Sequence, residues 1–118
     1  MHQINKAFKG RVIGGIFSNR ESAGKAIEDF QDLDISRHNI QMVQLEDKPS
    51  RDVYASFLVG RGFSHSQALY YDKAVRVGKI LVAVYEVNDH ALILNIFDKY
   101  KAEYQTKRRR NYRLLQQE

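Results

Sequence analysis

The sequence predicts one α+β domain in which two strand–helix–strand units build a four-stranded antiparallel sheet. Residues 10–17 and 78–85 share a glycine, then a basic residue, then a short apolar run. An apolar pattern with helical spacing follows each run and places Ala23 and Ala91 at matching positions. The chain has 118 residues, enough for one domain that folds without a disulfide or metal. These observations predict a repeated architecture within a single core.

The first unit begins with residues 11–17, a predicted buried strand. We expect a capping box next, in which the Ser18 hydroxyl accepts from the N–H of Glu21 and the Glu21 carboxylate reaches back. The helix then repeats apolar residues at steps of three and four, which predicts one buried stripe. That stripe contains Ala23, Ala26, Ile27, Phe30 and Leu33. Residues 40–45 alternate well enough for a second strand.

The middle of the chain predicts helical structure between the two units. Residues 53–59 suit a short helix, although a strand is also compatible with them. Residues 64–77 predict a helix that begins with a capping box of Ser64 and Gln67. Gly78 is expected to end this helix in a left-handed conformation.

The second unit contains the clearest strand of the chain. Residues 79–85 are apolar on both faces, which predicts a central position in the sheet. Asn88 is expected to cap a last helix that reaches about Lys99, and residues 102–107 suit a fourth strand. Two such units with right-handed crossovers give the ferredoxin-like arrangement, with helices on one face and an extra helix between the halves.

Charge divides the chain into a domain and a basic end. The net charge is +5, and residues 1–98 contain twelve basic and twelve acidic side chains. We therefore divide the chain into an N-terminal extension (1–9), a domain (10–106) and a basic tail (107–118). The chain has no cysteine, which excludes disulfides, thiolate zinc sites and cysteine nucleophiles. Neither a signal-peptide core nor a membrane-length apolar run is visible, so we expect a cytoplasmic protein.

The usual catalytic, metal and cofactor patterns are missing from the sequence. Gly14 and Gly15 do not complete a dinucleotide-binding motif, so we expect them to permit close packing instead. The four histidines, His2, His38, His65 and His90, lack metal-ligand spacing. No serine lies in a nucleophile-elbow context. The sequence predicts no catalytic residues, no metal and no cofactor.

Two features could contact a partner. Tyr70 and Tyr71 could stack on a base, but adjacent helical positions point about 100° apart, which favours one tyrosine in the core and one at its rim. The tail could contact nucleic acid phosphates, remain a solvated terminus, or dock onto an acidic face of another subunit. Its candidate contact residues are Lys107, Arg108, Arg109, Arg110, Tyr112 and Arg113.

Two blocks of the sequence carry a family resemblance. The first contains Val12, Ile13, Gly14, Gly15, Ile16, Phe17, Arg20, Ala23, Ala26 and Ile27. The second contains Gly62, Phe63, Ser64, Ala68, Tyr70, Tyr71, Ala74, Val75, Arg76, Gly78, Leu81, Val82 and Val84. Together with Asp34-Ile35-Ser36, they resemble the bacterial general stress protein domain of the heat-induced YflT type. The chain departs from that family in a shorter glycine-rich segment and in a basic rather than acidic end.

The resemblance implies a small stress-associated domain with no known enzymatic activity, cofactor or catalytic residues. Our first hypothesis is therefore a non-enzymatic domain that acts through self-association, as a homo-oligomer, or through partner binding. The second is a nucleic-acid-associated protein that binds through its tail. The third is a small-ligand regulatory domain, because ferredoxin-like dimers often form clefts between subunits.

Overall fold

The computed structural model describes residues 12–45 and 53–104. It contains an antiparallel sheet of three strands in the order β1 (Ile13–Phe17), β3 (Ile80–Val84) and β2 (Ile40–Val43). Both outer strands pair with β3, and Val84 lies opposite Ile13 on one side and Ile40 on the other. The predicted central position of β3 is confirmed.

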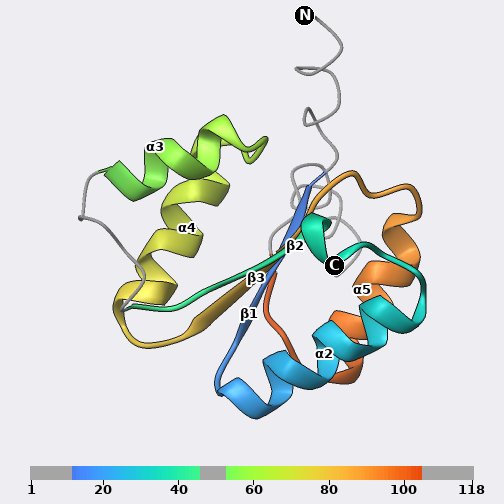
Figure 1. Cartoon of the computed structure of the whole chain (residues 1–118). Helices are drawn as coiled ribbons and strands as arrows, with labels where there is room; N and C mark the ends of the chain where they lie inside the picture. Colours follow the sequence, from blue (N-terminus) through green and yellow to red (C-terminus); the bar gives the residue numbers. More distant parts are fainter. Residues whose placement is uncertain (1–11, 46–52, 105–118) are drawn as a thin grey trace, which may run out of the picture.

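Helices cover both faces of this sheet (Figure 1). Helices α2 (Arg20–Asp32) and α5 (His90–Lys99) pack on one face, while α3 (Val53–Gly60) and α4 (His65–Arg76) pack on the other. The helices of the two units, α2 and α5, share one face as predicted, but α3 and α4 cover the other, because every residue of β1 and β3 is buried and both faces need a cover. A 3₁₀ turn, η1 (Arg37–Asn39), leads into β2.

The adjacent glycines of β1 seat an aromatic ring on each face. Successive strand residues point to opposite faces. A Cβ on Gly15 would lie 2.9 Å from three ring atoms of Phe97, and a Cβ on Gly14 would lie 3.1 Å from the side chains of Phe63 and Tyr71. The expected role of these glycines in close packing is confirmed.

The fourth predicted strand is present as one bridge within the described residues. The N–H of Ile16 donates to the Glu103 carbonyl at 2.7 Å, and the N–H of Glu103 donates to the Ile16 carbonyl at 2.9 Å. By alternation, the carbonyl of Gly14 also faces away from β3. It accepts from the Tyr71 hydroxyl at 2.9 Å. Residues 105–107 lie outside the described part of the chain.

The predicted helix caps are correct for α4 and wrong by one residue for α2 and α5. The Ser64–Gln67 capping box is confirmed, with bonds of 3.1 and 2.9 Å. Asn19, not Ser18, caps α2 by accepting from the N–H of Ser22. Asp89, not Asn88, caps α5 by accepting from the N–H of Leu92. Each wrong assignment came from two neighbouring residues that can both cap, between which propensity cannot choose.

The two strand–helix units share an architecture but not the predicted residue match. At an offset of 68 residues, Ile13 matches Leu81, yet Ile13 faces α2 and α5 while Leu81 faces α3 and α4. Ala23 is fully buried, whereas its match Ala91 is exposed. The repeat therefore exists at the level of elements, and equivalent residues lie on different faces.

Candidate functional site

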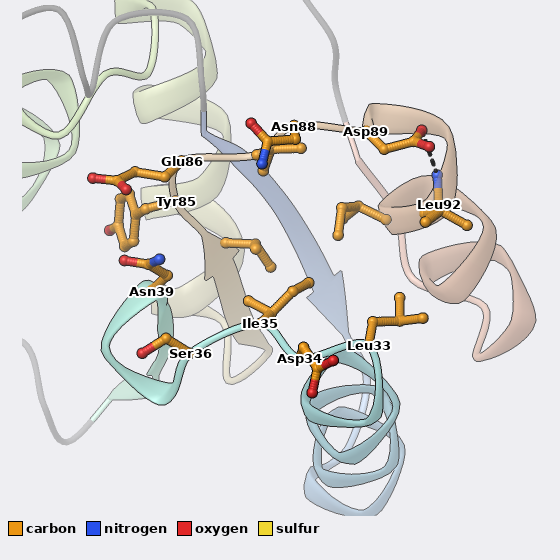
Figure 2. A pocket seen from close by; sticks show the side chains of 13 residues that line it. Leu33, Asp34, Ile35, Ser36, Asn39, Tyr85, Glu86, Asn88, Asp89 and Leu92 are labelled. Carbon is orange, nitrogen blue, oxygen red and sulfur yellow. Dashed lines mark hydrogen bonds between the residues drawn. The ribbon is translucent and has the colours of Figure 1, made fainter.

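A pocket of about 330 Å³ lies between two connections of the chain. One is the turn from α2 to β2, residues 33–39, and the other is the loop from β3 to α5, residues 85–89 (Figure 2). The two connections meet because β2 and β3 are antiparallel, so the start of β2 lies beside the end of β3. The sheet therefore brings together segments about fifty residues apart in the chain.

The floor of the pocket is apolar. Val84, Val87 and Ile93 are buried beneath it, and Ile35 is partly buried against the same core. Leu33 and Leu92 flank the opening with 41% and 43% of their surface exposed. Figure 2 shows Leu33, Ile35 and Leu92 around the space that they enclose. A small apolar group could lie against this floor without displacing any polar side chain of the protein.

The rim of the pocket is acidic. Asp34, Glu86 and Asp89 are exposed and line it, and none of the described lining residues is a lysine, arginine or histidine. Figure 2 shows the carboxylates of Asp34 and Glu86 on opposite sides of the pocket, directed away from its centre. Neither carboxylate has a hydrogen bond or ion pair with another described residue. Both side chains can therefore turn toward a bound cation by changing rotamer.

The helix termini at the pocket contribute charge of opposite sign. Helix α2 has no basic residue in its last turn, so the partial negative charge of its C-terminus adds to that of Asp34. The carboxylate of Asp89 is bound to the N-terminus of α5 through the N–H of Leu92 at 3.3 Å. Asp34 and Glu86 are consequently the carboxylates that contribute most negative potential to the rim.

The backbone at both of these carboxylates is left-handed. Asp34 has φ 68° and Glu86 has φ 56°. Asp34 follows the C-cap of α2, with its own N–H bonded to the Gln31 carbonyl and that of Ile35 bonded to the Phe30 carbonyl. Glycine usually occupies this position, and an L-residue there costs about 1–2 kcal/mol. The structure thus places a carboxylate where the backbone favours glycine.

One wall of the pocket is formed by Tyr85, a side chain already engaged in the core. Its hydroxyl donates to Oε1 of Gln41 at 2.6 Å, and its N–H donates to the Asn39 carbonyl at 2.8 Å. Burial raises the pKa of Tyr85, although the nearby Arg61 guanidinium acts in the opposite direction. Tyr85 is therefore a neutral phenol that lines the pocket in a position fixed by two hydrogen bonds.

The residues singled out from the sequence do not meet at this pocket. Tyr71 is fully buried, and Tyr70 is half-buried beside it, with ring centroids 5.1 Å apart. Burial raises the pKa of Tyr70, and the Glu103 carboxylate adds to this increase. The tail residues lie outside the described residues: Lys107, Arg108, Arg109, Arg110, Tyr112 and Arg113. Tail binding to nucleic acid and self-association both stay predictions.

The described residues include neither a metal-binding cluster nor a membrane-spanning helix. No group of three or more His, Cys, Asp or Glu side chains among them could hold a metal ion. No helix among them is long and apolar enough to cross a membrane.

Comparison with known proteins gives no relative for this chain. No family model, no curated protein and no solved structure matches it. The likeness to the YflT-type stress proteins therefore stays a resemblance carried by the residues themselves.

The pocket was missed at the sequence level because its residues belong to two connections. Residues 34–39 and 86–89 contain the polar side chains expected of any loop. A usable signal was present, because the predicted topology places the start of the second strand beside the end of the central one. Both connections carry carboxylates at that end of the sheet. The first connection also contains Arg37, which does not line the pocket.

Proposed function

We propose that this domain binds a small organic cation in the pocket between the α2–β2 turn and the β3–α5 loop. The ligand would be an amine with a short apolar body. The body would lie against Ile35, Val87 and Ile93, and the ammonium would lie at the rim near Asp34 and Glu86. The observation that carries this proposal is an apolar floor enclosed by a rim of carboxylates, with no lysine, arginine or histidine among the described residues that line it.

The size and charge of the pocket support this class of ligand. Its volume of about 330 Å³ is at the lower end of the range of roughly 300–1,000 Å³ for small-molecule sites. A charge a few ångströms from an exposed carboxylate gains about 1 kcal/mol, or about a five-fold preference over a neutral isostere. Salt should weaken that preference. The resemblance to stress proteins without known enzymatic activity also supports a binding role.

The proposal includes the ferredoxin-like sheet that the sequence predicts. Its support is the bridge between Ile16 and Glu103, at the position where a fourth strand would pair with β1. A carbonyl oxygen has two lone pairs. The Gly14 carbonyl can therefore accept from the Tyr71 hydroxyl and also from an N–H of a fourth strand. Such a strand would follow α5, the helix whose residues Leu92 and Ile93 line one side of the pocket.

The test compares three ligands with one carbon skeleton by NMR titration of the ¹⁵N-labelled chain. Isopentylamine is expected to shift the amide signals of residues 33–39 and 84–93, isopentanol to bind about five-fold more weakly, and isovalerate to bind weakest. Glu86→Gln should reduce the preference for the amine over the alcohol, because it removes one of the two carboxylates near the ammonium. The matched control, Glu28→Gln, removes a carboxylate of α2 that does not line the pocket and should keep the preference. Equal binding of isovalerate, or shifts confined to other residues, would rule out the proposed site.

A further inference from the structure

The described residues and the C-terminal segment carry net charges of opposite sign. Residues 12–45 and 53–104 contain nine basic and ten acidic side chains, which gives them a net charge of −1. Residues 105–118 contain five basic side chains and one acidic side chain. The chain therefore carries both an acidic pocket and a basic segment of complementary charge.

We propose that one cationic side chain of residues 107–113 occupies this pocket in the same molecule and competes there with a free ligand. This inference rests on the proposed function, because it treats the basic segment as an intramolecular version of the amine. The segment offers an ammonium or guanidinium on an apolar stem, the combination that suits an apolar floor with an acidic rim.

The direction of the chain at Glu103 supports a contact in the same molecule. Glu103 pairs with Ile16 in antiparallel orientation, so the chain at this point runs toward the Ile13 end of β1. Ile13 lies opposite Val84, which forms part of the pocket floor. At Glu103 the chain is therefore directed toward the end of the sheet where the pocket opens, and the basic segment follows a few residues later.

The distances also permit the contact. Three residues along β1 and two strand spacings across the sheet place the pocket within roughly 15 Å of Glu103. Residues 107–113 follow Glu103 by four to ten positions, and an extended chain of that length spans about 13–33 Å. At such short range, the effective concentration of the segment at the pocket is in the millimolar range. Even the weak affinity of one side chain can then give substantial occupancy.

A spin label provides the direct test, because the chain has no cysteine to interfere with labelling. The full chain with Asn111→Cys carries the label, and ¹⁵N relaxation is measured along the domain. We expect enhanced relaxation at residues 34–36 and 86–88, and much less at residues 78–80 at the opposite end of the sheet. The effect should disappear at about 0.5 M NaCl, where the Debye length is only about 4 Å. It should weaken in Glu86→Gln, while Glu28→Gln should leave it unchanged.

Two further measurements separate the possible failures. Spin-labelled chains without ¹⁵N can be mixed with ¹⁵N-labelled chains that carry no spin label. Enhanced relaxation in the ¹⁵N-labelled chains would show a contact between copies and overturn the proposal. A uniform effect along the domain would overturn it as well. Isopentylamine should displace the segment, and a full chain with Lys107 and the four tail arginines changed to glutamine should bind it about three- to ten-fold more tightly. Unchanged amine affinity would contradict the tail contact alone, whereas no amine binding in either chain would contradict the proposed function.

Discussion

The two faces of the sheet are packed by similar means but differ in how well their helices are terminated. Helices α3 and α4 are each followed by a left-handed glycine, Gly62 with φ 113° and Gly78 with φ 98°. On the opposite face, α2 and α5 place Asp34 and Lys101 at the same position, with φ 68° and 63°. A glycine adopts this conformation at little cost, whereas an L-residue does not.

The two faces also differ in what joins their helices. The α2/α5 face has an aromatic cluster in which Phe97 makes edge contacts with Phe17 and Phe30. It also has a polar link, in which Lys99 and the Tyr100 hydroxyl both donate to Asp29. The α2/α5 face therefore packs its aromatic ring more closely on the strand glycine, at 2.9 Å for Gly15 against 3.1 Å for Gly14, and is the more strained at its helix ends. One of its strained ends, at Asp34, forms the rim of the pocket.

The largest expected effect tests the aromatic packing of the two faces through adjacent glycines. Gly15→Ala should destabilise the protein by about 2–3 kcal/mol, because the new methyl group meets the fully buried Phe97 ring. Gly14→Ala should cost only about 1 kcal/mol, because its contacts at 3.1 Å involve separate side chains that can each shift slightly. Urea unfolding of both variants measures the difference.

This comparison has an internal control. Gly24→Ala in α2 places a methyl group where nothing lies within 4 Å, and it should stabilise the protein by about 0.5–1 kcal/mol. Equal losses for the two strand glycines would mean that the faces are packed equally tightly. The difference between them should shrink in a Phe97→Leu background, where the ring that opposes a Cβ at Gly15 is gone.

A smaller effect tests the helix ends. Gly78→Ala should destabilise the protein by about 1 kcal/mol, since its surroundings are open and only its left-handed backbone opposes a side chain. Asp34→Gly should do the reverse and stabilise the protein by about 0.5–1 kcal/mol. Thermal unfolding measures both. If Asp34→Gly is destabilising, the carboxylate must contribute contacts in the folded protein that outweigh its backbone strain.

The same contrast explains what could be predicted from the sequence. The helix that ends at Gly78 and the strand that follows it were predicted correctly, because each depends on local signals: a capping box, a glycine and a continuous apolar run. The end of α2 lacks such a signal, because Asp34 occupies a position that favours glycine. Leu33 was placed in the buried stripe, yet it is the C-cap and 41% exposed at the pocket.

The remaining differences depend on tertiary structure. A strand that is apolar on both sides needs two covering layers, but the pattern does not say which helix covers which side. The pocket depends on the meeting of two polar connections, neither of which is unusual by itself. Its acidic character follows only when the start of the second strand is placed beside the end of the central strand, as the predicted topology does.

The smallest expected effect concerns the polar link between α2 and α5. Asp29→Asn should lower the melting temperature by less than about 4 °C near neutral pH, because the Lys99 side chain that pairs with Asp29 is 60% exposed to solvent. Hydrogen bonds from Lys99 and then Tyr100 hold the pKa of Asp29 below its ordinary value of 3.8. The Asp29 side chain, in turn, raises the pKa of Lys99 above 10.5.

These two directions fix the pH window of the link. A lowered carboxyl pKa contributes stability above the unfolded pKa near 3.8, and the contribution is lost as the pH falls through the folded value. A raised lysine pKa contributes stability below 10.5, and that contribution is lost as the pH rises through the folded value. The difference between wild type and Asp29→Asn should therefore be constant from about pH 5 to pH 9 and vanish in stronger acid. The matched control, Asp32→Asn, removes an exposed carboxylate of the same helix and should show no such window. If both variants behave alike, net charge rather than the link to α5 determines the effect, and the two faces would then differ only in their aromatic packing and helix ends.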